Sequence, residues 1–318
     1  MTCKNNNHEL AALLLRSGLG LLFIIGGVSK LSLLLNSSTH DGMVANYMGT
    51  SGYINTLFQQ YLFTGGMGEL LTPSLFLTIL SGFELVSGIA LVSGFLVRPL
   101  ALLYAFLLWT FVIALPVMTV PGVTVDVKTY TSPAIFVQIR DIALSGMMFV
   151  LFNLGAGKAA LDNRFSSHVS EISWDNLGLL LRFSIGAMFI VAGFFGSFPS
   201  VPSFSTYQII LAAIGLCLIF GNVKVVKAAG FTTVLVMLWY MAHKLNMDKG
   251  FIENLNGFKR EFAFVAAGGT LFMLGGGRLF TMNDLVKRAR KYFSSQAVSG
   301  HQSLSLENSV PVNSNIND

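Results

Sequence analysis

Eight apolar stretches, most of them long enough to cross a lipid bilayer, constrain this chain more than any other feature. They lie at about residues 10–33, 73–96, 98–118, 134–154, 176–198, 205–222, 225–245 and 260–280. A helix needs roughly 20 predominantly apolar residues to span the hydrocarbon core. Only 11% of the residues are charged, well below the soluble average of about 25%. The sequence therefore predicts an all-α polytopic membrane protein with eight transmembrane helices.

A motif of one arginine, two glycines and one phenylalanine in the first stretch recurs in the fifth, 166 residues later. The two copies are Arg16, Gly20, Phe23 and Gly27, and Arg182, Gly186, Phe189 and Gly193. Lys30 of the first copy is lost, because Gly196 stands at its place. The fourth stretch also recurs, since Arg140-Asp141 matches Arg260-Glu261 at an offset of 120. We therefore predict two parallel-repeat four-helix bundles.

The repeat divides the chain into three parts. Residues 1–165 form the first unit, with a long outer loop at 34–72, and residues 166–280 form a second, degenerate unit. The outer loop is too apolar for a free linker, so we expect it to cap the first unit. Residues 281–318 combine a basic amphipathic segment with a tail poor in bulky residues, which is typical of a disordered terminus.

Positive charge predicts the orientation in the membrane, because cytoplasmic loops carry an excess of Lys and Arg. With the N-terminus inside, thirteen of the 20 Lys and Arg residues fall on the inner side. Both termini are therefore predicted to be cytoplasmic. The first apolar stretch follows a polar N-terminus without a small-residue cleavage site, so we expect it to be retained.

Several classes of site are not indicated by the sequence. Cys3 and Cys217 are the only cysteines, and no Cys/His metal spacing, P-loop or dinucleotide fingerprint occurs. We predict neither a metal nor a nucleotide. The net charge of +5 is concentrated near the C-terminus, which favours a role in topology over nucleic-acid binding.

Charges inside apolar stretches are the best candidates for chemistry, because each is costly to bury in a membrane. Glu84 lies near the middle of the second stretch, and Arg140 and Asp141 lie in the fourth. Estimated depths bring Arg16 within one or two helical turns of Glu84. We predict a buried network of these four side chains. It is either a structural set of ion pairs or a site where Glu84 and Asp141 transfer protons or hold a ligand.

The second half offers a different set of candidates. His243 and Lys244 lie near the outer end of the seventh stretch, and Arg260 and Glu261 begin the eighth. His243 titrates near neutrality and could exchange protons with a quinol, or it is an ordinary surface histidine. Trp239 either lines a headgroup pocket or belongs to the interfacial aromatic belt. No counterpart of Glu84 occurs here, so we expect the chemistry in the first unit and a structural role for the second.

These patterns resemble the DoxX/DoxD family of membrane proteins. The resemblance rests on three segments: the Arg16 to Lys30 motif, Phe83 to Gly88 with Gly94 to Arg98, and Arg140 to Leu144 with Gly155 to Lys158 and Leu161-Asp162. It covers residues 10–165 well and residues 176–280 more loosely. The long first loop and Glu84 are most similar to the DoxD type, the membrane subunit of thiosulfate:quinone oxidoreductase.

That resemblance implies electron transfer from a sulfur compound to quinone in the inner (cytoplasmic) membrane of a bacterium. Quinone would be the electron acceptor, with Glu84, Asp141 and His243 as catalytic groups. The groups expected to bind substrate or quinone are Arg16, Lys30, Arg140, Lys244, Arg260, Glu261 and Trp239. Membrane lipid, a soluble or single-span redox partner subunit and a second copy of the chain are the expected partners. A non-catalytic scaffold for a redox or detoxification protein, and a small-molecule transporter, are the alternatives.

Overall fold

The computed structural model describes residues 2–49, 52–64, 71–115, 124–127, 130–164, 173–195, 208–287 and 290. Within these ranges the chain is almost entirely helical. The exception is a hairpin of two short antiparallel strands, β1 (Thr124–Val127) and β2 (Tyr130–Pro133), with Thr124 opposite Pro133. A helical membrane protein satisfies its backbone hydrogen bonds within each helix, which lipid requires.

Each predicted apolar stretch contains a helix. The first half holds α1 (Thr2–Leu34), α4 (Pro73–Ser93), α5 (Val97–Ala114) and α6 (Ala134–Leu154), and the second holds α7 (Trp174–Phe195), α9 (Gln208–Phe220), α10 (Val223–Lys244) and α12 (Glu261–Leu274). Among the described residues, six of these are long and apolar enough to cross a membrane, namely α1, α4, α5, α6, α7 and α10. The remaining two are shorter, at 13 residues for α9 and 14 for α12.

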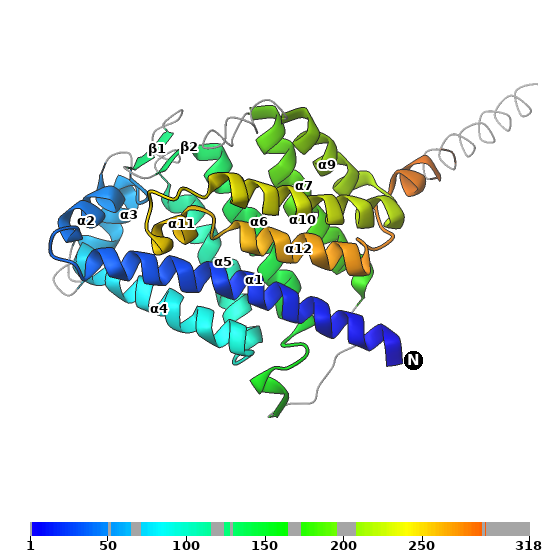
Figure 1. Cartoon of the computed structure of the whole chain (residues 1–318), viewed down its shortest axis with the longest axis horizontal. Helices are drawn as coiled ribbons and strands as arrows, with labels where there is room; N and C mark the ends of the chain where they lie inside the picture. The colour runs from blue at the N-terminus through cyan, green and yellow to red at the C-terminus, as the bar shows by residue number, and fades with distance from the viewer. Residues whose placement is uncertain are drawn as a thin grey trace, which may run out of the picture.

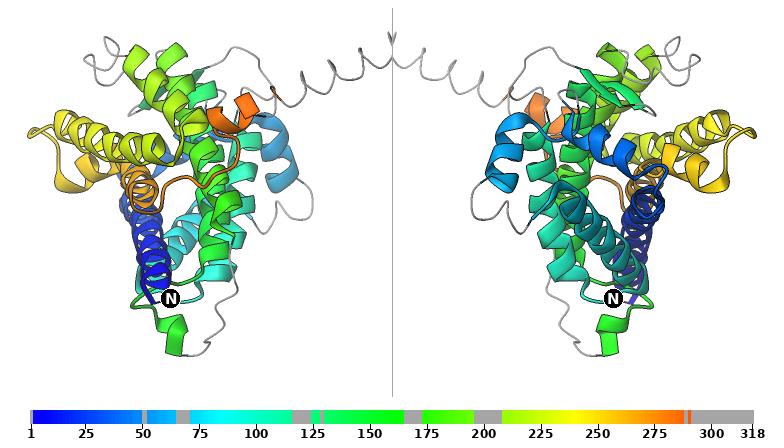
Figure 2. Two further views of the ribbon diagram at one scale, coloured as in Figure 1. Left: turned by 90° about the vertical axis from the view of Figure 1, so that its right-hand side faces the viewer. Right: turned by 90° about the vertical axis from the view of Figure 1, so that its left-hand side faces the viewer.

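The helix α1 lies at the centre of the packing, between α4 on one side and α12 on the other (Figures 1 and 2). Helix α6 packs in a similar way against α5 and α7, and α7 packs against α9. Contacts therefore join the two halves chiefly through α1 with α12 and through α6 with α7. The buried core runs continuously through both halves.

Glycines bring the helices of each half close together at matching places. A Cβ on Gly20 of α1 would lie 2.9 Å from the Gly88 carbonyl oxygen of α4. In the second half, a Cβ on Gly186 of α7 would lie 3.0 Å from the Gly215 carbonyl oxygen of α9. Small residues allow this backbone approach between membrane helices. The pairs α1–α4 and α7–α9 therefore make the same contact at positions that the sequence motif relates.

Other glycines have roles different from close helix packing. A Cβ on Gly82 would meet no atom within 4 Å, so this glycine is not needed for close packing. Gly94 and Gly275 end α4 and α12 with φ angles of +76° and +71°, which glycine adopts without a steric cost. Helix α12 consequently ends at Leu274, before residue 280 where the apolar pattern placed its end.

The long first loop is folded into two short helices, α2 (His40–Met48) and α3 (Thr56–Phe63) (Figure 1). A small apolar cluster of Leu34, Met43 and Leu77 joins α2 to α1 and α4. The Asn55 backbone N–H donates to the Ala114 carbonyl at 2.7 Å and fastens the loop to the end of α5. The loop therefore packs as a cap, and α11 (Phe251–Gly257) lies at the same end of the molecule (Figure 1).

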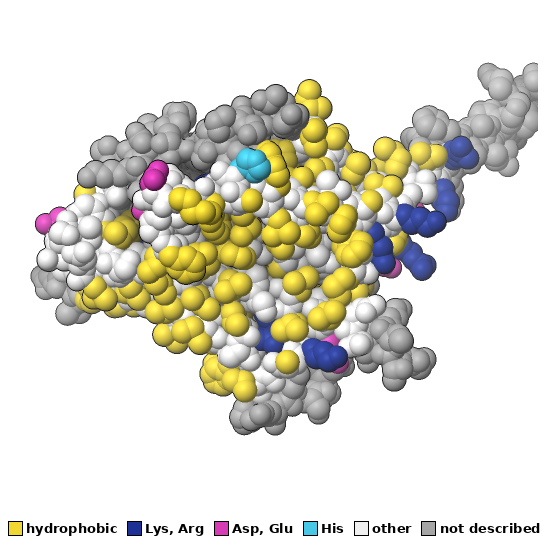
Figure 3. Space-filling model, viewed as in Figure 1, with side chains coloured by type: hydrophobic (Ala, Val, Ile, Leu, Met, Phe, Trp, Pro, Cys, Tyr) yellow, Lys and Arg dark blue, Asp and Glu magenta, His cyan; other side chains and the backbone are white. Residues whose placement is uncertain are grey.

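Large apolar side chains cover much of the surface in Figure 3, and they remain exposed along the outer helices. Examples are Ile79 at 58%, Val86 at 67% and Phe106 at 59% exposure. A soluble monomer rarely exposes so continuous an apolar surface. The fold and its surface are those of a multi-pass membrane protein. Residues 282–287 are helical, whereas the predicted disordered tail at 294–318 lies outside the described residues.

Candidate functional site

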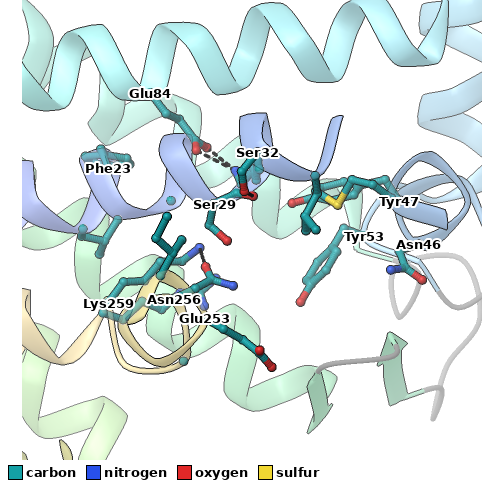
Figure 4. Close-up of a pocket in the computed structure, with 18 of the residues that line it drawn as sticks. Phe23, Ser29, Ser32, Asn46, Tyr47, Tyr53, Glu84, Glu253, Asn256 and Lys259 are labelled. Atoms are coloured by element: carbon teal, nitrogen blue, oxygen red, sulfur yellow. Dashed lines mark hydrogen bonds and ion pairs between the residues drawn. The ribbon is translucent and has the colours of Figure 1, made fainter. Parts of the chain in front are cut away.

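A cavity of about 1720 Å³ lies at the cap end of the molecule and is lined by residues of both halves. One wall is apolar, formed by Leu22, Phe23, Phe76, Leu80, Leu107, Leu108, Phe111, Leu115 and Leu144. The lining also carries charged and polar groups, namely Ser29, Lys30, Glu84, Arg140, Asp141, His243, Lys244, Asn256, Lys259, Arg260 and Glu261. Figure 4 shows this region between α1 above and the α11 segment below, with Tyr47 and Tyr53 of the cap beside it.

One polar contact in the cavity is an ion pair between α1 and α4. The Lys30 ammonium donates to both carboxylate oxygens of Glu84, at 2.6 and 2.7 Å. Only 16% of the Lys30 side chain and 5% of the Glu84 side chain are exposed. The packing of Gly20 on Gly88 sets the antiparallel register that brings these two side chains opposite each other. The pair compensates both charges at a position where either alone would be costly.

The second pair crosses between the halves. The Arg260 guanidinium, at the start of α12, lies 3.9 Å from an Asp141 carboxylate oxygen of α6. Asp141 and its neighbour Arg140 are both buried, as is Glu261. The two copies of the Arg-acidic motif therefore meet at one cavity. This convergence is not visible from the spacing of the motifs along the chain.

Lys259 adds a further cation beside these pairs. Its ammonium donates to the Asn256 side-chain oxygen at 2.7 Å (Figure 4). Burial lowers the pKa of Lys259 well below its ordinary value, the charges of Lys30 and Arg260 lower it further, and Glu84 opposes them. The polar end of the cavity is therefore crowded with positive charge.

His243 and Lys244 lie at the edge of the cavity. His243 is exposed, its ring lies tilted against that of Trp239 at a centroid distance of 4.1 Å, and its Nδ1 lies 3.0 Å from the Trp239 carbonyl oxygen. Lys244 lies 5.2 Å from the centre of the Tyr240 ring and donates to its hydroxyl at 3.2 Å. Trp239 itself is not among the residues that line the cavity. It supports His243 from outside.

Arg16 does not join the network that its estimated depth predicted. Its guanidinium donates to the carbonyls of Leu91 and Val92 at the end of α4, and to Lys158 and Ala159 after α6. Arg182 acts similarly in the second half, where it donates to the carbonyls of Gly221 and Leu279. Both arginines lie away from the cavity and satisfy helix-end carbonyls. Lys30 takes the place beside Glu84 that was expected for Arg16.

Several polar residues of the cavity could not be found from the motifs, because they belong to no repeat. They are Ser29, Ser32, Asn46, Tyr47, Tyr53 and Asn256. Three of them come from the cap, whose placement depends on tertiary packing. The position of Ser29 could have been inferred from the sequence, because it lies three residues after Gly26 and so shares a helix face with it.

The cavity can hold a molecule with an apolar body and a polar or anionic end. Binding sites commonly combine mostly apolar walls with a few convergent polar groups. The ion pairs can donate hydrogen bonds, and Glu84 and Asp141 are carboxyl groups within the same space. Among the described residues, no group of three or more His, Cys, Asp or Glu side chains could hold a metal ion.

Fold and site together define a class: helical, multi-pass membrane proteins with a charged cavity at one end of the helices. Residues 11–117, about a third of the chain, match the family model DoxX. The match runs from α1 through α5 and includes Lys30 and Glu84. No curated protein and no solved structure matches the chain.

Proposed function

We propose that the chain is the quinone-binding membrane subunit of a quinone-linked oxidoreductase that oxidises a sulfur compound. The observation that carries the proposal is the Lys30–Glu84 pair in a cavity that also has an extensive apolar lining. A quinone ring requires an apolar slot, and its carbonyl oxygens require hydrogen-bond donors. Leu108, Phe111 and Leu144 supply the apolar wall, and Lys30 supplies a donor.

The chemistry also requires protons at the site. Reduction of a quinone to a quinol takes up two electrons and two protons. Two thiosulfate anions release two electrons when they join through a new sulfur–sulfur bond to form tetrathionate. The two protons are taken up at the quinone, and we assign their transfer to Glu84, Asp141 and His243.

The same proposal places the protein in the inner membrane of a bacterium with both termini in the cytoplasm. In this arrangement α9 and α12 cross the membrane together with the six longer helices, giving eight spans in two related bundles. The matching contacts of Gly20 with Gly88 and of Gly186 with Gly215 support two units of common origin. The charged cavity then opens on the outer side, where a soluble substrate or a partner subunit reaches it.

Purified full-length protein in lipid nanodiscs tests the proposal. Bound quinone is extracted and quantified, and thiosulfate-dependent reduction of a short-chain quinone analogue is followed, both with the isolated chain and with co-purified partners. Glu84→Gln should reduce turnover at least tenfold while expression is unchanged. Glu9→Gln is the matched control, because Glu9 is exposed at the opposite end of α1. The proposal would be contradicted if the protein neither retained quinone nor reduced the analogue in any of these preparations.

A scaffold that recruits a redox or detoxification partner is the second candidate. The observation that favours it is the exposure of large apolar side chains on the cap, with Leu57 at 64% and Tyr61 at 83%. Replacing both with serine should abolish partner co-purification if the cap is the docking surface. Deletion of residues 294–318 tests the tail in the same assay. Full partner recovery in both variants would contradict the scaffold.

A further inference from the structure

Gly26 differs from the other glycines of α1 in what surrounds it. A Cβ on Gly27 would lie 2.7 Å from the Leu85 backbone nitrogen, so close helix packing excludes a side chain there. A Cβ on Gly26 would instead lie 3.4 Å from the Glu84 Oε2 atom and 3.4 Å from the Lys259 Nζ atom. Gly26 therefore leaves space between two charged side-chain ends inside the cavity.

The charges around this space are unevenly balanced. Both carboxylate oxygens of Glu84 accept hydrogen bonds from the Lys30 ammonium. Among the described residues, no carboxylate oxygen lies within 4.0 Å of the Lys259 ammonium, whose hydrogen-bond partner is the neutral Asn256. Other cations, Lys30 and Arg260, act on Lys259 and lower its pKa. A negative charge placed here would relieve this repulsion.

We infer that a small oxyanion binds beside Gly26, held by Lys259 of the second half together with Lys30 and Ser29 of the first. Ser29 and Lys30 follow Gly26 by three and four residues, so all three share one face of α1. Each of them lines the cavity. The inference deepens the proposed function and rests on it for the cavity as the working site, but it requires no electron transfer.

The chemistry of the donors defines the class of ligand. Ammonium and hydroxyl groups donate hydrogen bonds to oxygen atoms that carry negative charge, and such bonds are stronger than neutral ones. Sulfur oxyanions, phosphate and small carboxylates share this chemistry. A larger anion would have to displace the Lys30–Glu84 pair, since the free space at Gly26 is bounded by Glu84 on one side.

Anion binding can be measured without turnover by isothermal titration calorimetry on the full chain in nanodiscs. The probes are thiosulfate, sulfate, phosphate and acetate, each titrated separately against a chloride background. Lys259→Gln should weaken binding about 10- to 100-fold, the range expected for loss of a charge-assisted hydrogen bond. Lys249→Gln is the matched control, because Lys249 belongs to the same connection but is 49% exposed. Lys259→Arg retains the charge and should restore most of the affinity.

Gly26→Ala provides an independent arm, because its Cβ fits at van der Waals distance and the protein should still fold. It should weaken anion binding, whereas Gly82→Ala on the open face of α4 should not. Equal affinity in wild type and Lys259→Gln, or no saturable binding of any probe by wild type, would overturn the inference. Quinone retention is scored on the same preparations, so loss of anion binding with quinone retained separates this inference from the proposed function.

Discussion

The Lys30–Glu84 pair makes a quantitative prediction about stability. Lys30→Met alone leaves a carboxylate that is only 5% exposed without its cation, and Glu84→Leu alone leaves an ammonium that is 16% exposed. Removing one partner of a buried pair costs about 3–5 kcal/mol, because the remaining charge is uncompensated. The cavity lets some water reach Lys30, so we expect about 3 kcal/mol for each single variant, at the lower end of that range.

The double variant is expected to be far less destabilised than the sum of the single variants. An apolar pair of similar volume replaces a buried ion pair at little net cost. With each single variant at about 3 kcal/mol and the double variant near zero, the predicted coupling energy is about 6 kcal/mol. A neutral hydrogen bond between membrane helices averages about 0.6 kcal/mol, so the two cases are clearly separated.

The assay is reversible unfolding in mixed detergent micelles with increasing SDS, followed by tryptophan fluorescence. A second cycle on Lys249 and Glu253 serves as the control, because that pair is 3.4 Å apart with side chains 49% and 52% exposed. An exposed pair of this kind should couple by only about 0.3–0.5 kcal/mol. A Lys30–Glu84 coupling no larger than that of the control would refute the view that this pair is desolvated.

Three further predictions follow from the packing and the charges. Gly88→Ala should destabilise the protein by about 1–3 kcal/mol in the SDS assay, because its Cβ would lie 2.8 Å from a carbonyl oxygen of α1, whereas Gly82→Ala should be neutral. Anion affinity should fall as pH rises, because the pKa of Lys259 is lowered in the empty cavity and a bound anion raises it, so that binding takes up a proton. Calorimetry at several pH values should show this fall in affinity. Lys259→Arg should abolish the pH dependence. Asp162→Ala should cost about 1–2 kcal/mol and speed proteolysis of the α4–α5 turn, because the Asp162 carboxylate accepts two backbone N–H bonds at 2.9 Å.

The apolar pattern predicted the helices well because length and hydropathy are local properties of the chain. Residues 73–96 predicted α4, which spans Pro73–Ser93. Helix ends were less predictable, since the end of α12 depends on the backbone conformation of Gly275. Whether α9 and α12 cross a membrane, and whether the chain arose by duplication, stay predictions.

The charged site was only partly predictable for a geometric reason. Depth along a helix can be estimated from residue number, but the register between two helices cannot. Gly20 packs on Gly88, so Arg16 comes level with Leu91, seven residues beyond Glu84 and about 10 Å further along the axis of α4. The same register brings Lys30 to Glu84. An error of two helical turns in register was enough to assign the wrong cation.

The second half has a different part in the site from the structural one that its sequence suggested. At the offset of 166 residues, Gly26 corresponds to Ala192, and at the offset that aligns Gly94 with Gly221, Glu84 corresponds to Leu211. Both residues are buried, at 0% and 2% exposure, so in this half apolar side chains fill the positions that correspond to Gly26 and Glu84. Yet Lys259 of the same half reaches the cavity of the first, because α12 packs along α1. The second half thus has apolar residues at the positions that correspond to Gly26 and Glu84, yet it supplies a cation to the cavity, which makes the site dependent on both halves.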